Sequence, residues 1–408
     1  MQVTYEKCAG MDVHKDSVYV CVAKSAEGGV TKEVRTFGTT TRELLRLREW
    51  LEAEGVTHGA MESTGVYWKP VLNVLDGAVE VWLANATEVK NLPGRKTDVK
   101  DCEWLADLMR HGLIRRSFVP DGATYELREL TRYRTQVTRE RASEVNRIQK
   151  MLEGANIKLG SVLSDVMGKS GRAILDAMAG GETNSAKLAG LAVDRVLKTK
   201  RADLELALDG KVRDHHRFML KMLLKRIDDM DKVLAELDQE VERRLHPFDE
   251  TIRRLDGIPG IARRAAEVVL AEIGTDMTRF KTSGHLASWA GLCPGNNKSA
   301  GKRYSGKTRK GSKWLRSILV EAAWASSRKK NSYFQAKYGR LKGRRGPKKA
   351  AVAQAHALLV VIYNLLKSGS TYQDLGATYL DERAREQVVA RLTKRLAKLG
   401  YDVTRKTA

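Results

Sequence analysis

The feature that most constrains the fold is a succession of β-strand patterns near the start of the chain. Cys8–Val13 is a short apolar run, and in Ser17–Lys24 valines alternate with other residues, as they do in a strand. Glu27-Gly28-Gly29 supplies the glycines of a hairpin turn, and Val30–Phe37 follows with a third strand pattern. The chain is therefore predicted to begin with three strands in series.

Helix and strand patterns alternate after these three strands. Thr41–Glu54 has apolar residues at helical spacing, and Thr57–Met61 has the pattern of a fourth strand. Trp68–Leu75 has the pattern of a second helix and Val79–Ala84 that of a fifth strand. Three strands in series followed by alternating helix and strand is the element order of a ribonuclease-H-like fold. We therefore predict an α/β domain of this kind over residues 1–120.

Four acidic residues in this domain occupy positions that suit metal ligands. Asp12 lies in the first strand, and Glu62 lies at the C-terminal end of the fourth, where α/β sheets place ligands. Asp98 and Asp101 are three residues apart in a predicted helix, so their carboxylates project from one face. Taken singly, these acids have ordinary explanations: acids at strand ends are usually solvated, and acids at the start of a helix favour its dipole. The four together predict a site for Mg²⁺ or Mn²⁺, which prefer oxygen ligands.

Composition indicates the class of partner. The 408 residues include 73 lysines and arginines against 50 acidic residues, a net charge of +23. Such an excess is typical of nucleic-acid-binding proteins, although a basic protein without that function is also possible. The four cysteines are scattered without a C-x-x-C pair, which argues against a zinc ribbon or a disulfide scaffold. No run approaches the length of a membrane-spanning helix and no signal peptide is evident, so we expect a cytoplasmic protein without a membrane partner.

Residues 121–250 are predicted to form a helical, coiled-coil-like region. Tyr125–Leu159 and Phe218–Leu245 carry apolar residues three and four positions apart. This spacing predicts either a helical hairpin within one chain or a seam between subunits whose arginine-rich faces contact nucleic acid. The intervening residues 160–214 predict a helical insert without an assigned function. Adjacent histidines in Asp214-His215-His216 point to different helix faces, which argues against a metal site. The arginines of the first helix are Arg128, Arg132, Arg134, Arg139, Arg141 and Arg147.

A mostly helical domain is predicted over residues 251–380. Ile258-Pro259-Gly260-Ile261 is similar to a helix-hairpin-helix turn, which offers backbone N–H groups to a phosphate, although such a turn can also simply join two helices. Seven basic residues and no acids lie between Lys298 and Lys313, a density that predicts contact with phosphates. Arg328–Lys349 adds basic residues with aromatic residues among them, which either stack on bases or belong to the core. The candidate nucleic-acid contacts are Lys298, Lys302, Arg303, Lys307, Arg309, Lys310, Lys313, Arg344 and Arg345.

Three further features of this region are predicted from the residues alone. Ser299 lies in the basic stretch, and without an adjacent histidine–aspartate pair to activate its hydroxyl, backbone capping is its default role. Ala350–Leu366, which contains His356, is predicted to be an apolar core helix. Residues 381–408 are predicted to form a charged helical tail.

The chain resembles the DEDD transposases of the insertion-sequence one-ten group, which are bridge-RNA-guided recombinases. The resemblance covers about residues 5–375, and the usual Ser-Gly of the family is Ser299-Ala300 here. It rests on these motifs: Gly10-Met11-Asp12-Val13-His14-Lys15, Met61-Glu62-Ser63-Thr64-Gly65, Lys96-Thr97-Asp98-Val99-Lys100-Asp101, Gly291-Leu292-x-Pro294, Ser299-x-Gly301 and Trp314-Leu315-Arg316.

The resemblance implies a RuvC-like nuclease domain with a metal site and a C-terminal transposase domain with a serine nucleophile. Its metal ligands would be Asp12, Glu62, Asp98 and Asp101, and Ser299 would become covalently joined to DNA. His356 occupies the position of a family histidine near the site. His14 and Lys15 belong to the motif, but we expect His14 to pack or hydrogen-bond rather than to bind metal.

The resemblance also implies partners. They are target and donor DNA, a noncoding guide (bridge) RNA, and further copies of the chain, as a dimer that assembles into a tetramer and shares each active site between subunits. The location implied is the bacterial cytoplasm, in association with the nucleoid. Two alternatives stay open: a metal-dependent RuvC-like endonuclease that cuts junctions with water instead of serine, and a nucleic-acid-binding protein without activity.

Overall fold

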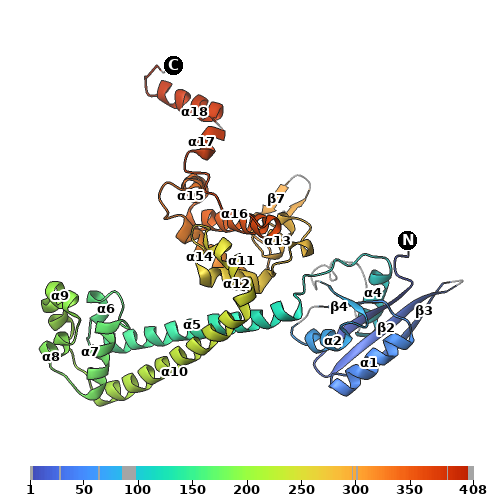
Figure 1. The fold of residues 1–408 in the computed structure, drawn as a ribbon, viewed down its shortest axis with the longest axis horizontal. Coiled ribbons are helices and arrows are strands. Elements are labelled where there is room, and N and C mark those ends of the chain that lie inside the picture. The colour runs from blue at the N-terminus through green and yellow to red at the C-terminus, as the bar shows by residue number, and fades with distance from the viewer. Residues whose placement is uncertain are drawn as a thin grey trace. The chain divides into compact units, whose positions relative to one another are not determined.

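The computed structural model describes residues 3–26, 29–62, 65–84, 98–295, 297–299, 302–383 and 385–402 (Figure 1). For residues 98, 99, 297–299, 303, 304 and 388 it describes the backbone only. The chain separates into two compact units, Met1–Val119 and Pro120–Ala408. The hairpin turn predicted at Glu27-Gly28-Gly29 falls largely outside the described residues. A finer division of the second unit into a coiled-coil region, a transposase domain and a tail stays a prediction.

The first unit is built on a five-stranded sheet of mixed direction. In the sheet order β3-β2-β1-β4-β5, strands β3, β2 and β1 are antiparallel neighbours, whereas β1, β4 and β5 are parallel neighbours. The predicted order of strands and helices along the chain is confirmed, with every element within two residues of its predicted bounds. The elements are β1 (Lys7–Val13), β2 (Ser17–Ala26), β3 (Gly29–Gly38), α1 (Thr41–Ala53), β4 (His58–Glu62), α2 (Trp68–Leu75), β5 (Glu80–Ala84) and α4 (Asp98–Arg110).

Helices cover both faces of this sheet (Figure 1). Larger apolar side chains, among them Met11, Val20 and Met61, pack with α1 and α2 on one face. Smaller side chains, such as Cys8 and Ala60, are buried under α4 on the other. Because side chains alternate between the faces of a strand, the even-numbered residues of β1 and β4 belong to the α4 face.

Helix α4 approaches β1 so closely that only glycine fits between them. A Cβ atom on Gly10 would lie 2.1 Å from the carbonyl oxygen of Cys102 and 2.3 Å from the backbone nitrogen of Ala106. Both contacts are with backbone, which cannot move aside as a flexible side chain would. Gly10 therefore fixes the distance between the strand that carries Asp12 and the helix that carries Asp101.

We expect Gly10→Ala to lower the free energy of unfolding of the first unit by about 3 kcal/mol, because the added methyl overpacks a backbone contact. Urea unfolding followed by circular dichroism measures the change. Gly38→Ala is the matched control, since its methyl would meet only the flexible Glu43 side chain, at 3.3 Å. Equal stability of the two variants would contradict the close packing of α4 on β1.

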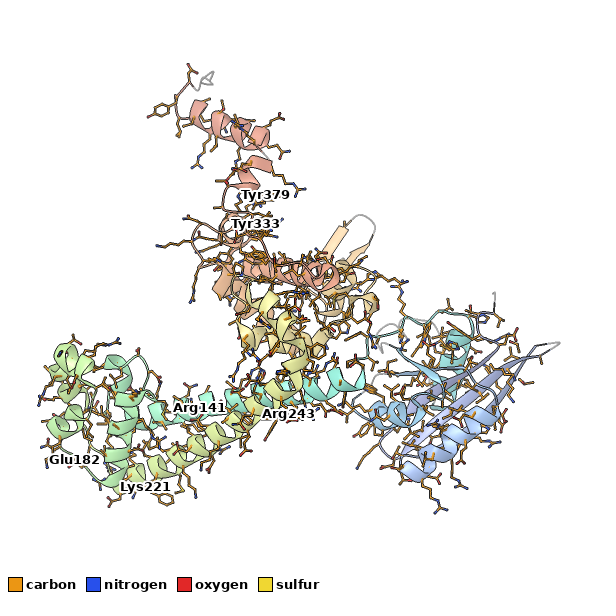
Figure 2. All side chains as sticks on the ribbon, viewed as in Figure 1. Arg141, Glu182, Lys221, Arg243, Tyr333 and Tyr379 are labelled. Carbon is orange, nitrogen blue, oxygen red and sulfur yellow. The ribbon has the colours of Figure 1, made fainter. Side chains whose placement is uncertain are left out.

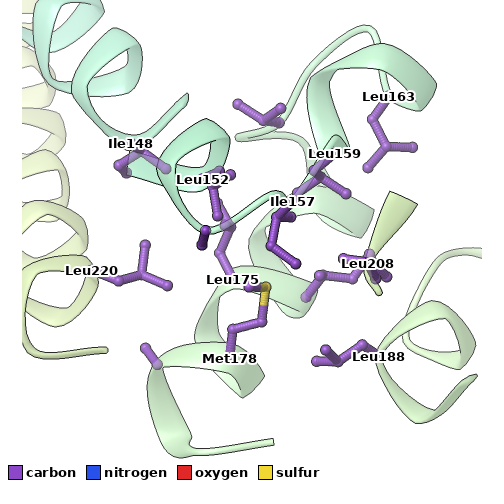
Figure 3. Close-up of a cluster of buried hydrophobic side chains, with 14 of the residues drawn as sticks. Ile148, Leu152, Ile157, Leu159, Leu163, Leu175, Met178, Leu188, Leu208 and Leu220 are labelled. Carbon is purple, nitrogen blue, oxygen red and sulfur yellow. The ribbon is translucent and has the colours of Figure 1, made fainter. Parts of the chain in front are cut away.

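The second unit begins with a long helical hairpin and an insert at its far end. Helices α5 (Gly122–Gly154) and α10 (Asp214–Leu245) run side by side within one chain, so the intramolecular hairpin of the two predicted alternatives is present (Figure 1). The insert packs on the end of the hairpin, with Leu175 and Met178 against Ile148 and Leu220 (Figure 3). Its helices are α6 (Leu159–Val162), α7 (Lys169–Gly180), α8 (Ser185–Gly190) and α9 (Asp194–Ala207).

The rest of the second unit is mostly helical, apart from a short β-hairpin. Phe334 and Tyr338 are buried, so these two aromatic residues belong to the core and are not available to stack on bases. The elements are η1 (His246–Phe248), α11 (Asp249–Asp256), α12 (Arg263–Ile273), η2 (Met277–Arg279), α13 (Ser283–Trp289), β6 (Asn297–Ser299), β7 (Lys302–Ser305), α14 (Lys313–Ser326), α15 (Tyr333–Arg345), α16 (Pro347–Ser368), α17 (Tyr379–Arg383) and α18 (Arg385–Ala397).

One expectation from the sequence requires correction. The expectation that no run approaches the length of a membrane-spanning helix is wrong. By length and composition alone, helix α16 could cross a membrane. Its apolar residues have another use, because α16 packs against α13, α14 and α15 and buries Leu358, Leu359 and Ile362. It is the core helix that the sequence predicted.

Candidate active site

The first candidate site lies on the α4 face of the sheet, where two predicted ligands are neighbours. Strands β1 and β4 are parallel, with Met11 opposite Met61. Asp12 and Glu62 are the next residue in each strand, and so they lie side by side on the face that α4 covers. Both are partly buried, and the Asp12 side chain is 15% exposed. The register of two strands thus brings together acids far apart in the sequence.

Helix α4 contributes the other two predicted ligands from its first turn. Asp98 is the first helical residue, and only its backbone is described, whereas Asp101 is partly buried. Asp101 directly precedes Cys102, whose carbonyl contacts Gly10 in β1. Burial raises the pKa of the Cys102 thiol to about 11, and the nearby Glu103 and Asp12 carboxylates add to the rise. The Asp12 carboxylate is therefore near enough to the start of α4 to influence the ionisation of Cys102.

The chemistry of the predicted ligands suits a hard divalent cation, because all four are carboxylates, the ligands that Mg²⁺ and Mn²⁺ prefer. Of these, Asp12 and Glu62 lie side by side on one face of the sheet. Among the side chains that the structure describes, no three potential ligands stand close enough together to form a metal site. The Asp98 side chain is not among them. Nε2 of His14 lies 3.1 Å from Oδ2 of Asp12, so His14 forms a hydrogen bond, as expected.

The second candidate site is the β6–β7 hairpin, which carries Ser299. In its register Lys298 is opposite Arg303 and Ser299 is opposite Lys302. The ladder continues below β6 and β7, through a bridge between Pro294 and Thr308 and a hydrogen bond of 2.9 Å from the Gly295 nitrogen to the Lys307 oxygen. Ser299 thus ends one strand at the tip of a long β-ribbon, although its side chain is not among those described.

Motif residues hold the base of this ribbon together. A Cβ atom on Gly311 would lie 2.3 Å from the backbone nitrogen of Gly291, so the two segments touch through their backbones. The Arg316 guanidinium donates to the carbonyl oxygen of Gly291 at 3.2 Å and to the Thr308 hydroxyl at 2.8 Å. The Gly-Leu-x-Pro and Trp-Leu-Arg motifs therefore have a structural role in the ribbon that bears Ser299.

A buried carboxylate that no sequence pattern marks, that of Glu272, connects the base of the ribbon to α5 and α12. The Glu272 side chain on α12 is 0% exposed and accepts two hydrogen bonds from Arg132, at 2.7 and 2.9 Å. It also accepts a hydrogen bond of 2.9 Å from the hydroxyl of Ser312, which in turn caps α14. Arg128 donates to the carbonyl oxygens of Ala271 and Glu272, and burial lowers its pKa to about 10.

Most arginines of α5 bind acids of the same chain, which limits their contact with a partner. Arg134 is buried and pairs with Glu267 at 2.8 Å and with Asp238 at 3.1 Å. Arg141, which is labelled in Figure 2, pairs with Asp231 across the helical hairpin. Arg128 and Arg134 are buried and bind carbonyl or carboxylate groups of this chain, so they are not available to nucleic acid. Arg132, Arg141 and Arg147 also pair with acids but are at least partly exposed, and for these three contact with nucleic acid stays a prediction.

The basic residues after Ser299 differ from those of α5. Those with described side chains are exposed, and no ion pair joins any of them to an acid within the described part of the chain. Their charge is therefore available to a partner. These residues are Lys302, Lys307, Arg309, Lys310, Lys313, Arg344 and Arg345, whereas the side chains of Lys298 and Arg303 are not described.

The structure also gives the positions of His216, His356 and the helix-hairpin-helix-like turn. His216 accepts a hydrogen bond of 3.2 Å from the Arg213 backbone nitrogen and so caps α10. His356 is partly buried on α16, where burial and the nearby Lys337 lower its pKa. The turn at Gly260 packs on α14, because a Cβ there would lie 2.3 Å from the Ala322 oxygen. Contact of this turn with DNA stays a prediction.

Comparisons with known proteins match both halves of this description. Residues 9–157 match the DEDD transposase domain of the IS110 (insertion-sequence one-ten) family, described as a transposase. Residues 252–339 match a domain described as "Transposase IS116/IS110/IS902 family". The first match spans the five-stranded sheet and α5, and the second spans the ribbon and most of the helices around it.

Two relatives are similar to the chain over part of their length. The Sinorhizobium fredii protein y4pF/y4sB, which is named as a transposase, is 34% identical over 145 residues, which are 34% of this chain and 37% of that protein. The 43.6 kDa protein of insertion element IS110 from Streptomyces coelicolor is 30% identical over 133 residues, 31% of each chain. The chain thus spans only about a third of the curated relatives it matches.

We expect Glu272→Gln to lower the free energy of unfolding of the second unit by about 3 kcal/mol, because it leaves buried guanidinium charge uncompensated. Glu240→Gln, at a partly exposed position, is the control. Arg243 and Arg244 lower the pKa of Glu240 to about 2, yet this solvent-screened pair should contribute little to stability. Unfolding in urea at several salt concentrations measures both effects, and equal midpoints for the two variants would contradict a structural role of Glu272.

Proposed function

Because the chain carries the two domains of the IS110-family transposases, we propose that it is an RNA-guided DNA recombinase of an insertion sequence, which cuts and rejoins DNA through a covalent phosphoserine. The observation that carries the proposal is the placement of Asp12 and Glu62 as neighbours on the sheet face under α4, within a domain that matches DEDD transposases. Nuclease domains of this kind use such acids to act on phosphodiesters.

The four acids are proposed to act as one metal site. Asp12, Glu62, Asp98 and Asp101 would hold Mg²⁺ or Mn²⁺ through carboxylate oxygens. Bound there, the cation would stabilise negative charge on the attacking and leaving oxygens. The acids themselves orient it, and Asp12 is oriented in turn by its 3.1 Å contact with His14.

Ser299 is the proposed nucleophile. Its hydroxyl oxygen forms a bond to a DNA phosphorus, the bond from that phosphorus to the 3′ oxygen breaks, and the serine proton is lost as the 3′ oxygen gains one. The products are a phosphoserine and a free 3′-hydroxyl, and the reverse attack by another 3′-hydroxyl rejoins the strand. The exposed cations near the ribbon, among them Lys302 and Lys307, support this role because they favour a serine alkoxide and bind the phosphate.

A noncoding guide RNA is proposed to choose the target and donor sequences. An exposed cationic surface, such as the one formed by the described basic residues after Ser299, recognises backbone and helix shape, whatever the base sequence. Base pairing with a guide would supply the missing sequence information. We further propose that the acids and Ser299 of one active site come from different subunits of a dimer or tetramer.

Covalent trapping tests the serine. Wild-type protein with labelled DNA should give a denaturant-resistant protein–DNA adduct, and Ser299→Ala should lower adduct formation and strand exchange at least about a thousandfold. Ser305→Ala, in the same hairpin, is the matched control and should keep the adduct. Asp12→Asn should abolish cleavage by any mechanism that uses the acids. If Ser299→Ala still cuts DNA, the alternative holds: a metal-dependent, junction-cutting endonuclease that uses water.

Co-purification tests the guide. Protein produced together with the noncoding ends of its insertion sequence should carry RNA from them, and RNase treatment should abolish site-specific strand exchange while leaving the folded protein intact. Sequencing of the bound RNA identifies the guide. Site choice that survives complete removal of RNA would contradict guidance and leave the protein itself as the reader of sequence.

A further inference from the structure

Three cations surround one aromatic ring where α5 meets α14. The ring is that of Trp314, in the first turn of α14 and partly exposed. The distance to its centroid is 5.1 Å from Nζ of Lys313, 5.3 Å from Cζ of Arg139 and 5.8 Å from Cζ of Arg132. Arg132 and Arg139 come from α5 and Lys313 adjoins the ring in the sequence, so the cluster joins two elements far apart along the chain.

Only one of the three cations is neutralised within the described part of the chain. Arg132 forms its paired hydrogen bonds with the buried Glu272. Arg139 donates to the Ser317 hydroxyl at 3.3 Å, and no ion pair joins Arg139 or Lys313 to an acid there. Ser317 itself is 3.4 Å from the Glu321 carboxylate on the same helix. Two exposed cations are thus held near one ring without an anion between them.

We propose that Arg139, Lys313 and Trp314 form a binding site for the phosphodiester backbone of a nucleic acid. The inference rests on the proposed function, since it adds a contact to the same nucleic-acid complex. Each cation lies about 5 Å from the ring centroid, so the two are at most about 10 Å apart, close enough to contact neighbouring phosphates of one strand. Cation–π attraction to the ring restricts both side chains before binding, which lowers the entropy lost when they bind.

The location favours this ligand over a small anion. Lys313 ends the basic stretch that follows Ser299, in which Lys307, Arg309 and Lys310 are also exposed. Arg139 extends that surface from the transposase-type domain onto α5, where the other arginines are occupied by acids or carbonyls. A backbone that follows the basic stretch would therefore reach α5 at Arg139. Duplex DNA and single-stranded RNA share the required phosphodiester chemistry.

The test is the salt dependence of binding by the full-length protein. Fluorescence anisotropy with a short duplex DNA and, separately, with a single-stranded RNA gives the affinity at a series of salt concentrations. The double variant Arg139→Gln, Lys313→Gln should bind roughly tenfold more weakly per lost contact at 0.1 M salt, and the slope of log affinity against log salt should fall by about two. Arg139→Lys, which keeps the charge, should keep the slope.

The matched control is the double variant Arg141→Gln, Arg243→Gln. It removes the same net charge from arginines that are paired with Asp231 and Glu240, and so it should leave the slope unchanged (Figure 2). A thermal melt of each variant checks the fold. If the first double variant is poorly folded, Lys313→Gln alone, which removes an exposed side chain, should still lower the slope by about one.

Each outcome decides a different question. A reduced slope with DNA alone, with RNA alone or with both supports the site and names the source of the phosphates. An unchanged slope and affinity with both probes, while the wild type binds, overturns the site but leaves the proposed function standing. A wild-type protein that binds neither probe overturns the proposed function and the site together.

Discussion

The second unit depends on one buried carboxylate. Glu272 has no contact with water, so its charge must be compensated inside the protein, and two arginines of α5 and the Ser312 hydroxyl supply that compensation. These partners come from two separate parts of the chain, α5 and the start of α14, and Glu272 itself belongs to a third, α12. Glu272, together with the Arg134–Glu267 pair, holds α12 on α5, and through Ser312 it also connects these helices to the start of α14 and the base of the ribbon bearing Ser299. An uncharged residue in its place would fill the same volume without selecting these three partners.

Close backbone contact through glycine occurs beside both candidate sites. Gly10 lets α4 approach the strand of Asp12, and Gly311 lets the two strands of the ribbon meet at Gly291. Gly260 likewise lets its turn lie directly on α14. Backbone atoms cannot change rotamer, so a contact of this kind positions neighbouring groups more rigidly than side-chain packing does. Both candidate sites of the chain rest on such contacts.

The sequence predicted the elements well and their partners less well. Alternation along Ser17–Lys24 and the apolar spacing of Thr41–Glu54 identify a strand and a helix locally, so the α/β unit could be predicted almost element by element. Apart from Glu144, the acids that bind the α5 arginines lie 90 to 140 residues away, and no local pattern reveals them. For the same reason the pattern of α5 predicts a surface position for Arg134, although it is buried. No pattern marks Glu272 either, because an acid in an amphipathic helix usually faces water.

Helix α5 has a consequence for how the chain can vary. It is 33 residues long, which corresponds to about 50 Å. Arginines in its first half form ion pairs with Glu272 and Glu267, and apolar residues in its last turns pack in the core of the insert. Inserting or deleting one residue between them would rotate one end by about 100° relative to the other. The length of α5 can therefore change only by whole helical turns, accompanied by an equal change in α10. The helix thus fixes both the distance and the rotation between its two ends.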